Sequence, residues 1–389
     1  MSKVLIICLS DPSKAPRPKR MVEYCLERGN QVSVLSPPPN SKVPGVEYFS
    51  TGSSHPRLPP LIIRNIRNVS GAIIQKFLTN DSLKEGVINL SQGLATAKAE
   101  LLAKNFDLVL VEDLDCLPFA FSIRKSAKVI FDAREFYPKQ RENNLFFRHF
   151  QAPYRTQICR NYLPKCSGLI TVSPGIASKY EEEFGVHAKI FRSTPNLHQL
   201  PTRTLSAEKI RMVHHGLANP NRQLEKMVDV FSLLDSRFHL DMYLTGNSFV
   251  IRELRLKARN IPNLRILDPV PLKEIIPTIS NYDIGFFYVE PLTFNLKYCL
   301  PNKLFEFIQA RLAVAIGPSP DMARIVEQNG CGFVSKKFTV ESMAERLTCL
   351  SASEIQSAKE KSNVAAFELC FEKEKQVLDD LLDGLECRL

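Results

Sequence analysis

The chain has 389 residues, of which 44% are hydrophobic and 24% are charged, and it carries a net charge of +10. This composition is typical of a globular protein, and the length predicts two domains of roughly 150–200 residues each. No apolar stretch approaches the roughly 20 residues that cross a membrane, and the first apolar run is too short for a signal peptide, so we expect a cytoplasmic protein.

The N-terminal half begins with a strand, a helix and a second strand. Residues Val4–Leu9 form a continuous apolar run, which is typical of a strand buried on both faces. A helix is predicted over Pro18–Arg28, where Gly29 is placed to end it, and a strand over Gln31–Ser36. Such alternation predicts a parallel α/β sheet. The further elements expected in this half are strands at Asp107–Val111, Lys128–Phe131, Ser167–Val172 and Lys189–Arg192, and helices at Leu94–Lys104 and Gly175–Phe184.

The segment Arg57–Phe77 has a different pattern, with apolar residues at helical spacing and Arg64, Arg67 and Lys76 between them. Two interpretations stay open, a helix packed on the sheet and a basic amphipathic helix on an anionic membrane surface. The net charge also allows nucleic acid or polyanionic small substrates as partners. Charge alone does not choose among these partners.

A polar stretch, Ser193–Leu205, is predicted as an interdomain linker and is followed by a second α/β series. We therefore predict domains over residues 1–200 and 201–370, and a helix over 371–389 that packs back on the first domain. Ligands of doubly wound sheets bind beyond the carboxyl ends of the strands, so the expected site is the cleft between the two facing halves. The elements predicted in this series are strands at Ile210–His214, Leu240–Leu244, Leu264–Leu267, Ile284–Tyr288, Val314–Ile316 and Gly332–Val334, and helices at Leu224–Leu234, Lys303–Arg311 and Asp321–Gln328.

The segment Pro301–Glu306 holds the residues that point most directly to a ligand. Pro301 precedes the first turn of a predicted helix, whose free N–H groups and dipole favour an anion. Lys303 adds positive charge for a diphosphate, and Glu306, one turn further, can accept two hydrogen bonds from a ribose diol. An exposed lysine and a first-turn glutamate that only favours the dipole remain the alternative.

The wider sequence around this helix resembles glycosyltransferase family 4, whose members have the GT-B fold and include bacterial enzymes of polysaccharide and glycolipid synthesis. The resemblance is carried by Pro301–Gly317, and it continues through Pro318–Met322 and Gly330–Phe333. It implies that Glu306 binds the ribose of a nucleotide sugar and that Lys303 and Arg222 meet the diphosphate. The other donor-binding residues it implies are Gly216, Gly246, Asn302 and Ser319.

Motifs in the N-terminal half resemble the same family. They are Val111–Pro118, Phe131–Pro138, Thr171–Ala177 and Pro195-Asn196, and the resemblance makes Arg134 and Glu135 the candidate catalytic residues. Many relatives have histidine at the position of Arg134, and arginine stays charged at pH 7 and cannot act as a base. Arg134 is therefore expected to hold a phosphate or an acidic sugar instead.

Further candidate contacts are less specific. Tyr298 stands where many relatives have a first glutamate, so the sugar hydroxyl contacts are unassigned, with Glu290 as one substitute. Two interpretations stay open for Arg17 and Arg20, at the end of the first strand: contacts with the diphosphate or the acceptor, and solvated cations. A basic face on the N-terminal domain, together with the 57–77 segment, suggests a lipid-linked or otherwise anionic acceptor. The residues of that face are Lys139, Arg141, Arg148, His149, Arg155, Arg160 and Lys165.

The sequence thus predicts an α/β protein of the GT-B fold, with two facing doubly wound Rossmann-like domains. The resemblance implies a glycosyltransferase that moves a sugar, with retention, from a nucleotide diphosphate sugar, UDP rather than GDP, to a glycan or lipid-linked acceptor. We expect it to work without a metal, in the cytoplasm and peripherally on the inner face of the membrane. No cluster has metal-ligand spacing, and the ten cysteines, none in Cys-x-x-Cys spacing, are expected to be reduced.

Three other functions can be compared with this one. A nucleotide-sugar 2-epimerase has the same architecture and remains an alternative. A nucleic-acid-binding protein would explain the charge, but no binding motif is present, so we expect no nucleic acid partner. A nicotinamide-dependent dehydrogenase is excluded, because Ser10–Pro18 has no Gly-x-Gly-x-x-Gly after the first strand.

Overall fold

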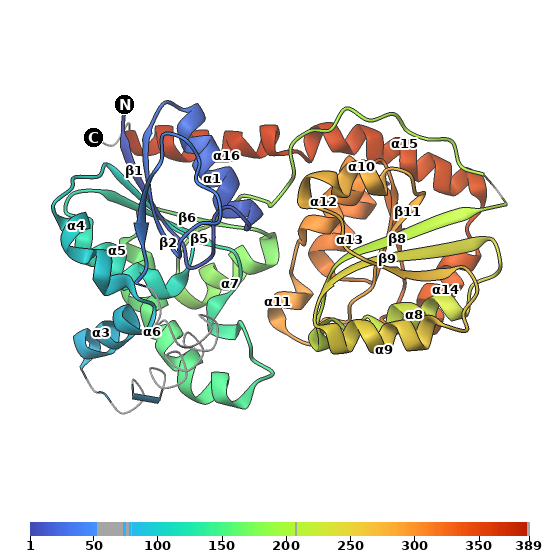
Figure 1. The fold of residues 1–389 in the computed structure, drawn as a ribbon, viewed down its shortest axis with the longest axis horizontal. Coiled ribbons are helices and arrows are strands. Elements are labelled where there is room, and N and C mark those ends of the chain that lie inside the picture. Colours follow the sequence, from blue (N-terminus) through green and yellow to red (C-terminus); the bar gives the residue numbers. More distant parts are fainter. Residues whose placement is uncertain (53–72, 75–77, 79, 207, 387–389) are drawn as a thin grey trace. The chain divides into compact units, whose positions relative to one another are not determined.

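A computed structural model describes residues 1–52, 73–74, 78, 80–206 and 208–386 (Figure 1). The chain divides into two compact units, each with its own parallel sheet. Unit 1 comprises residues 1–172, 176–191 and 381–389, and unit 2 comprises residues 173–175 and 192–380. The long predicted helix over 57–77 falls largely outside the described residues.

Unit 1 is built on a seven-stranded sheet in the order β3-β2-β1-β4-β5-β6-β7, in which all the neighbouring strands run parallel. Its central strands are continuous apolar runs because both of their faces are buried, as all four residues of β4 are. The strands are β1 (Lys3–Ile7), β2 (Gln31–Ser36), β3 (Glu47–Ser50), β4 (Leu108–Val111), β5 (Lys128–Ala133), β6 (Gly168–Thr171) and β7 (Lys189–Ile190).

The chain order of this sheet reverses between β1 and β4, which lie side by side. Such a switch point leaves a crevice beyond the carboxyl ends of the two strands. The helices of the unit are α1 (Pro16–Glu27), α3 (Asp81–Ser91), η1 (Leu94–Ala97), α4 (Lys98–Leu102), η2 (Leu114–Cys116), α5 (Leu117–Ile123), η3 (Tyr137–Lys139), the π-helical turn η4 (Phe147–Gln151), α6 (Ala152–Tyr162), η5 (Leu163–Lys165) and most of α7 (Pro174–Phe184).

Unit 2 has a six-stranded parallel sheet in the order β10-β9-β8-β11-β12-β13, with its switch point between β8 and β11. The strands are β8 (Ile210–Ala218), β9 (Phe238–Gly246), β10 (Leu264–Leu267), β11 (Ile284–Phe287), β12 (Ala313–Ile316) and β13 (Gly332–Val334). The helices are η6 (Pro220–Arg222), α8 (Glu225–Ser232), α9 (Ser248–Ala258), η7 (Leu272–Glu274), α10 (Ile275–Ile279), α11 (Phe294–Lys297), α12 (Asn302–Gln309), α13 (Pro320–Asn329), α14 (Val340–Thr348), α15 (Ala352–Glu368) and α16 (Phe371–Glu386), whose last residues belong to unit 1.

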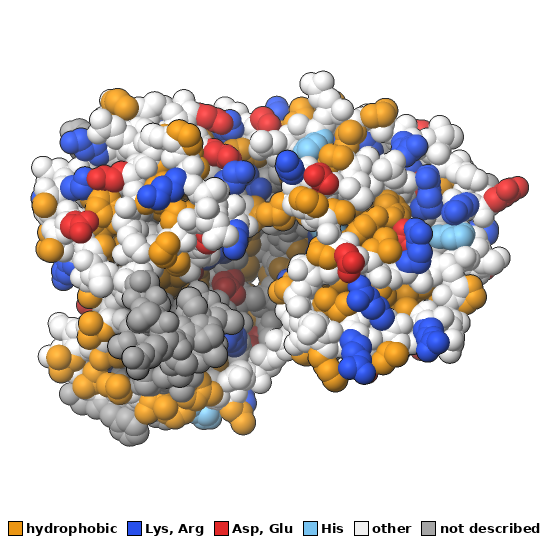
Figure 2. Space-filling model, in the orientation of Figure 1, with side chains coloured by type: hydrophobic (Ala, Val, Ile, Leu, Met, Phe, Trp, Pro, Cys, Tyr) orange, Lys and Arg blue, Asp and Glu red, His pale blue; other side chains and the backbone are white. Residues whose placement is uncertain are grey.

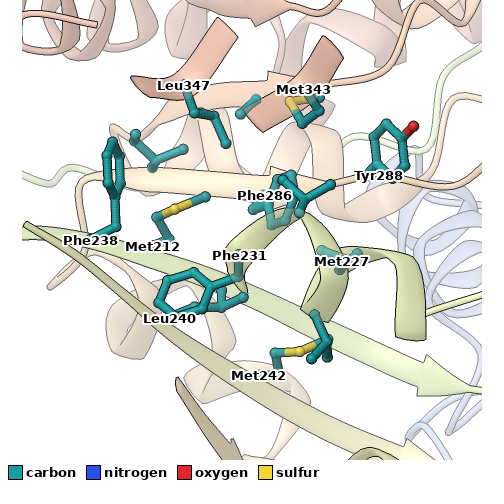
Figure 3. Packing of buried hydrophobic residues seen from close by; sticks show 14 of the residues in the cluster. Met212, Met227, Phe231, Phe238, Leu240, Met242, Phe286, Tyr288, Met343 and Leu347 are labelled. Carbon is teal, nitrogen blue, oxygen red and sulfur yellow. The ribbon is translucent and has the colours of Figure 1, made fainter. Parts of the chain in front are cut away.

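The sheet of unit 2 separates two apolar clusters because successive residues of a strand face opposite sides. Phe286 packs into the cluster shown in Figure 3, with Met212, Phe238 and Leu240, while the next residue, Phe287, packs into the other cluster with helix α12. Helices therefore cover both faces of the sheet, and the carboxyl ends of its strands remain for a ligand.

Several predicted boundaries differ from the structure. The predicted helix over Leu94–Lys104 is a 3₁₀ turn, η1, followed by the short helix α4. Strand β3 and helices α3 and α9 were not predicted, although Asn247 caps α9 by accepting hydrogen bonds from the N–H groups of Phe249 and Val250. The nine cysteines that the structure describes are unpaired, and no described helix is long and apolar enough to span a membrane.

Candidate functional site

The switch point of unit 2 brings the end of β8 beside the end of β11, and α12 begins next to them. Pro301 has an extended backbone and precedes α12, so the free N–H groups of its first turn open toward this edge. Lys303 lies in that first turn with only 6% of its surface exposed. The sequence therefore placed this helix start correctly, but the lysine is buried rather than on the surface.

The ammonium group of Lys303 is held by neutral neighbours. Its Nζ lies 3.5 Å from Nε2 of His214 and 4.8 Å from the centre of the Phe287 ring. The Nδ1 of His214 lies 2.9 Å from the carbonyl of Phe286, which can only accept, so Nδ1 carries the proton and Nε2 is the acceptor that faces Lys303. Among the described residues, Lys303 forms no ion pair within 4.0 Å.

Burial, followed by the charge of Arg222, lowers the pKa of Lys303 to about 7, although Glu306 acts in the opposite direction. A cation in this position is costly unless an anion accompanies it. The lysine therefore has the electrostatic character of an anion-binding group rather than that of a structural ion pair.

Gly216 leaves space for the side chain of Lys303. Its backbone has a positive φ of +132°, and a Cβ added there would lie 2.8 Å from Nζ of Lys303. Gly246, at the end of β9, has another reason to be glycine, since a Cβ there would lie 2.5 Å from Leu217 and 2.9 Å from the carbonyl of Ala218. Gly246 thus permits close packing of two strands, which is a role that the sequence did not suggest.

Glu306 lies one turn after Lys303 and is partly exposed. Its Oε2 is 3.2 Å from Nε2 of His215, in a geometry that does not make a hydrogen bond. Burial, then the charge of Lys303, lowers the pKa of His215 to about 3, so this histidine is neutral and the contact is not an ion pair. The carboxylate of Glu306 therefore keeps its capacity to accept hydrogen bonds from a ligand.

Five buried polar atoms at this edge have no hydrogen-bond partner in the part of the chain that the structure describes. Buried polar groups are nearly always hydrogen-bonded, so such a concentration indicates a polar ligand. Figure 3 shows one of them, the hydroxyl of Tyr288, pointing away from the apolar cluster. The atoms are His215 Nε2, Asn219 Oδ1, Gln223 Oε1, Tyr288 OH and Ser319 Oγ. Each belongs to the end of β8, β11 or β12 or to the loop that follows it.

The structure thus gathers Gly216, Arg222, Lys303, Glu306 and Ser319, with Asn302 in the same first turn as Lys303. The substitute proposed for the missing glutamate is engaged elsewhere, because Glu290 pairs with Lys226, and the ring of Tyr298 packs on Phe294. Sequence reasoning gave no role to His214, His215, Gln223 or Tyr288, although the family resemblance included His215-Gly216 and Asn221–Glu225. The adjacent histidines at the end of a predicted strand were another signal available.

The switch point of unit 1 carries a second polar cluster. Arg17 forms a two-point ion pair with Asp132, at 2.5 and 2.7 Å, and donates to the carbonyl of Phe191. Arg134 pairs with Asp113 at 2.7 Å. These contacts favour a structural role for Arg17, and they engage one side of the guanidinium of Arg134.

Glu112 lies within this cluster, directly after β4, and is fully buried. Neither of its carboxyl oxygens has a hydrogen-bond partner among the described residues. Burial, then the charge of Asp132, raises the pKa of Glu112 to about 8. Since Asp113 and Asp132 each have an arginine, Glu112 is the carboxyl group that keeps its proton at neutral pH.

The variant Glu112→Gln is therefore expected to be more stable than the wild type at pH 8, by about 1–3 kcal/mol. The folded wild type binds a proton that the unfolded chain has lost between pH 4.5 and 8, so its stability falls as the pH rises through that window. The variant lacks this dependence. Urea unfolding of both proteins at pH 5 and pH 8 measures the difference, and an advantage of the variant that does not grow with pH would contradict the assignment.

A pocket of about 990 Å³ adjoins this cluster within unit 1, and the ends of β1 and β4 supply Leu9, Ser10, Asp113 and Asp115 to its lining. Arg155 reaches Asp115 at 2.9 Å and also contacts Gln140. Glu135 accepts a hydrogen bond from Gln140, and burial raises its pKa. Arg20 lies in α1 and is not among the residues that line this pocket.

The two switch-point sites belong to a two-domain α/β protein whose second domain has a buried cation and unsatisfied polar atoms at its switch point. No protein-family model and no curated protein sequence matches the chain. Solved structures do match it. A structure of S. aureus TarM with fondaparinux, alpha-GlcNAc-glycerol and UDP has a TM-score of 0.69 at 10% identity, and covers 98% of this chain and 99% of that one.

Two other structures have similar agreement. WaaG, a glycosyltransferase involved in lipopolysaccharide biosynthesis, has a TM-score of 0.67 at 12% identity, over 96% of this chain and 98% of that one. HepE of Anabaena, solved with UDP-glucose, has a TM-score of 0.66 at 11% identity over all of both chains. At such identities the likeness establishes the fold, so the predicted GT-B fold is confirmed.

Proposed function

We propose that the protein is a glycosyltransferase that takes a sugar from a UDP-sugar donor held by unit 2. The observation that carries this proposal is the buried Lys303, a cation without an ion-pair partner among the described residues, beside five unsatisfied polar atoms at a Rossmann-like switch point. Structural neighbours that were solved with UDP or UDP-glucose support the choice of uridine. We assign the protein to glycosyltransferase family 4 as part of the same proposal.

Each residue of the site has a role in this function. Lys303, Arg222 and the first N–H groups of α12 stabilise the negative charge that develops on the leaving diphosphate. Glu306 accepts hydrogen bonds from the ribose diol, and Ser319, Asn302 and Tyr288 supply neutral hydrogen-bonding groups. The diphosphate leaves from the face of the sugar on which the acceptor enters, so the reaction retains the anomeric configuration, and no step requires a metal.

The acceptor, a glycan or a lipid-linked glycan, occupies the pocket of unit 1, next to Arg134 and Asp113. We propose that the protein acts in cell-surface polysaccharide or glycolipid synthesis at the cytoplasmic side of a membrane. Arg134 is a positioning residue for the acceptor rather than a base.

A thermal-shift screen of nucleotide diphosphates and their sugars tests the proposal. We expect UDP and at least one UDP-sugar to raise the melting temperature of the protein by several degrees. The nucleotide is added at about 1 mM, which corresponds to about 100 times the expected dissociation constant. GDP and ADP are expected to raise it less. No shift with any of these nucleotides would contradict the donor assignment.

A 2-epimerase of the same fold would bind the same donor, and product analysis separates it from a transferase. An epimerase converts UDP-GlcNAc to its C2 epimer without an acceptor, whereas the transferase consumes the donor only when an acceptor or water takes the sugar.

Nucleic-acid binding has less support from the charge distribution. In unit 2, lysine and arginine side chains gather where β8 begins, at the opposite end of the sheet from Lys303 (Figure 2). Two of them are already paired, Arg211 with Asp283 and Arg265 with Asp241. At this patch the protein's own carboxylates therefore compete with the phosphates of a nucleic acid.

A further inference from the structure

The charge balance of the unit 1 pocket bears on what the acceptor can be. Its charged lining residues are three acids and three bases, Asp11, Asp113, Asp115, Lys14, Arg141 and Arg155. The sequence predicted a basic face on the N-terminal domain, and only two residues of that face, Arg141 and Arg155, line the pocket. The lining as a whole has no excess of positive charge.

The acids and the buried cation of the pocket are already satisfied by the protein. Asp113 pairs with Arg134 and Asp115 with Arg155. Asp11 accepts hydrogen bonds from the backbone and hydroxyl of Ser13 at 2.8 and 2.7 Å and from the backbone of Asn40 at 3.2 Å. Lys14 and Arg141 are exposed, so a charged ligand would find no uncommitted buried cation among the described lining residues.

The rest of the lining is suited to a neutral polyhydroxyl ligand. The hydroxyl of Ser10 is buried at the pocket and has no partner in the described part of the chain. Four amide side chains and three aromatic rings join it, and amides and rings recognise hydroxyl groups and apolar ring faces, respectively. These residues are Gln92, Gln140, Asn144, Gln151, Tyr137, Phe146 and Phe147.

We propose that the acceptor presents an uncharged sugar to this pocket, and neither a phosphate nor a carboxylate. This inference rests on the proposed function. Burying a phosphate dianion in this pocket without an uncommitted buried cation would be costly, because Arg134 and Arg155 already neutralise carboxylates and the other two basic residues of the lining are exposed. The acceptor therefore carries a sugar before it reaches this protein, so an earlier glycosyl transfer must supply it.

Binding experiments on the full chain with saturating UDP test the inference. The probes are a panel of neutral methyl glycosides and disaccharides, glucose 6-phosphate as a soluble phosphate, and geranylgeranyl phosphate as a lipid phosphate. We expect a neutral probe to bind with a dissociation constant that changes less than about twofold between 50 and 500 mM NaCl, because an uncharged ligand is not screened. Tighter and salt-sensitive binding of either phosphate would overturn the inference.

Two variants that each remove one polar group sharpen the test. Gln151→Ala is expected to lower the affinity for the neutral probe by about tenfold at most, which is the value of one net hydrogen bond. Arg141→Gln is expected to change this affinity by less than about twofold. The opposite order would favour an anionic acceptor. If UDP binds but no neutral probe does, the inference alone fails, whereas absence of UDP binding to the wild type would contradict the proposed function itself.

Discussion

Replacing Lys303 with methionine is expected to make the protein more stable and far weaker at binding UDP. Methionine fills a similar volume without a charge, so it removes the cost of burying an ammonium group. Because burial lowers the pKa of Lys303 to about 7, folding is penalised at every pH below the normal value of 10.5, by the full amount below pH 7. We expect a gain of about 1–4 kcal/mol at pH 7, which narrows as the pH rises toward 10.5.

Donor binding should change in the opposite direction. In the variant, no buried cation stabilises the diphosphate in this site of low polarity. We therefore expect transfer activity to fall on the order of 10²–10³-fold. Urea unfolding and initial-rate measurements on the same preparation check the two effects. Lys337→Met, the same substitution at an exposed position of unit 2, is the control and should change neither. A destabilised variant with normal UDP affinity would show that Lys303 is structural.

Glu306→Ala is expected to lower the affinity for UDP about 100-fold, since two hydrogen bonds from the ribose to a charged carboxylate are lost. Glu306→Gln keeps one acceptor oxygen and should weaken binding by about tenfold. The fold should persist, because Glu306 is partly exposed and its contact with His215 is not a hydrogen bond. Calorimetric titration of UDP into the three proteins measures these changes.

Comparison with 2′-deoxy-UDP assigns the role of Glu306 to the ribose. The wild type should prefer UDP, and Glu306→Ala should lose that preference, because the two changes remove the same interaction. An unchanged preference in the variant would mean that the carboxylate binds another part of the donor or none of it.

The strands were predictable because a parallel strand buried on both faces is a continuous apolar run, as in Val4–Ile7 and Leu108–Val111. The start of α12 was predictable for a local reason, since Pro301 and Lys303 lie within three consecutive residues of the sequence. Strand β3, in contrast, has only four residues at the sheet edge, with one of them buried, so it lacks an apolar run.

The burial of Lys303 and its contacts with His214 and Phe287 could not be predicted from the sequence. They arise because β8 and β11 pair across a separation of about seventy residues, for instance Met212 with Ile284. The same limit applies in unit 1. Glu112 is left without an ion-pair partner because Asp132 on β5 pairs with Arg17, and Asp113, which follows β4, pairs with Arg134.

The position of Arg17 in the sequence suggested a contact with the ligand, whereas its contacts in the structure favour a structural role. Its place after the first strand was compatible with a phosphate contact, but its guanidinium binds Asp132 on β5 and lies 4.6 Å from the centre of the Phe191 ring. Arg134 was expected to meet an acidic group of the ligand, and one side of its guanidinium pairs with Asp113 of the protein. Local sequence gave no sign of these partners, which lie on other strands.

Calorimetric titration of UDP into the wild-type chain between pH 7 and pH 9 tests the central claim most directly. The β-phosphate of UDP is already ionised in this range, since its last pKa is near 6, so the titration reports on the protein. If protonated Lys303 holds the diphosphate, UDP should bind saturably at pH 7, and the affinity should fall by up to about tenfold per pH unit above it, with proton uptake on binding. Absence of saturable UDP binding at pH 7, or an affinity independent of pH, would contradict the account.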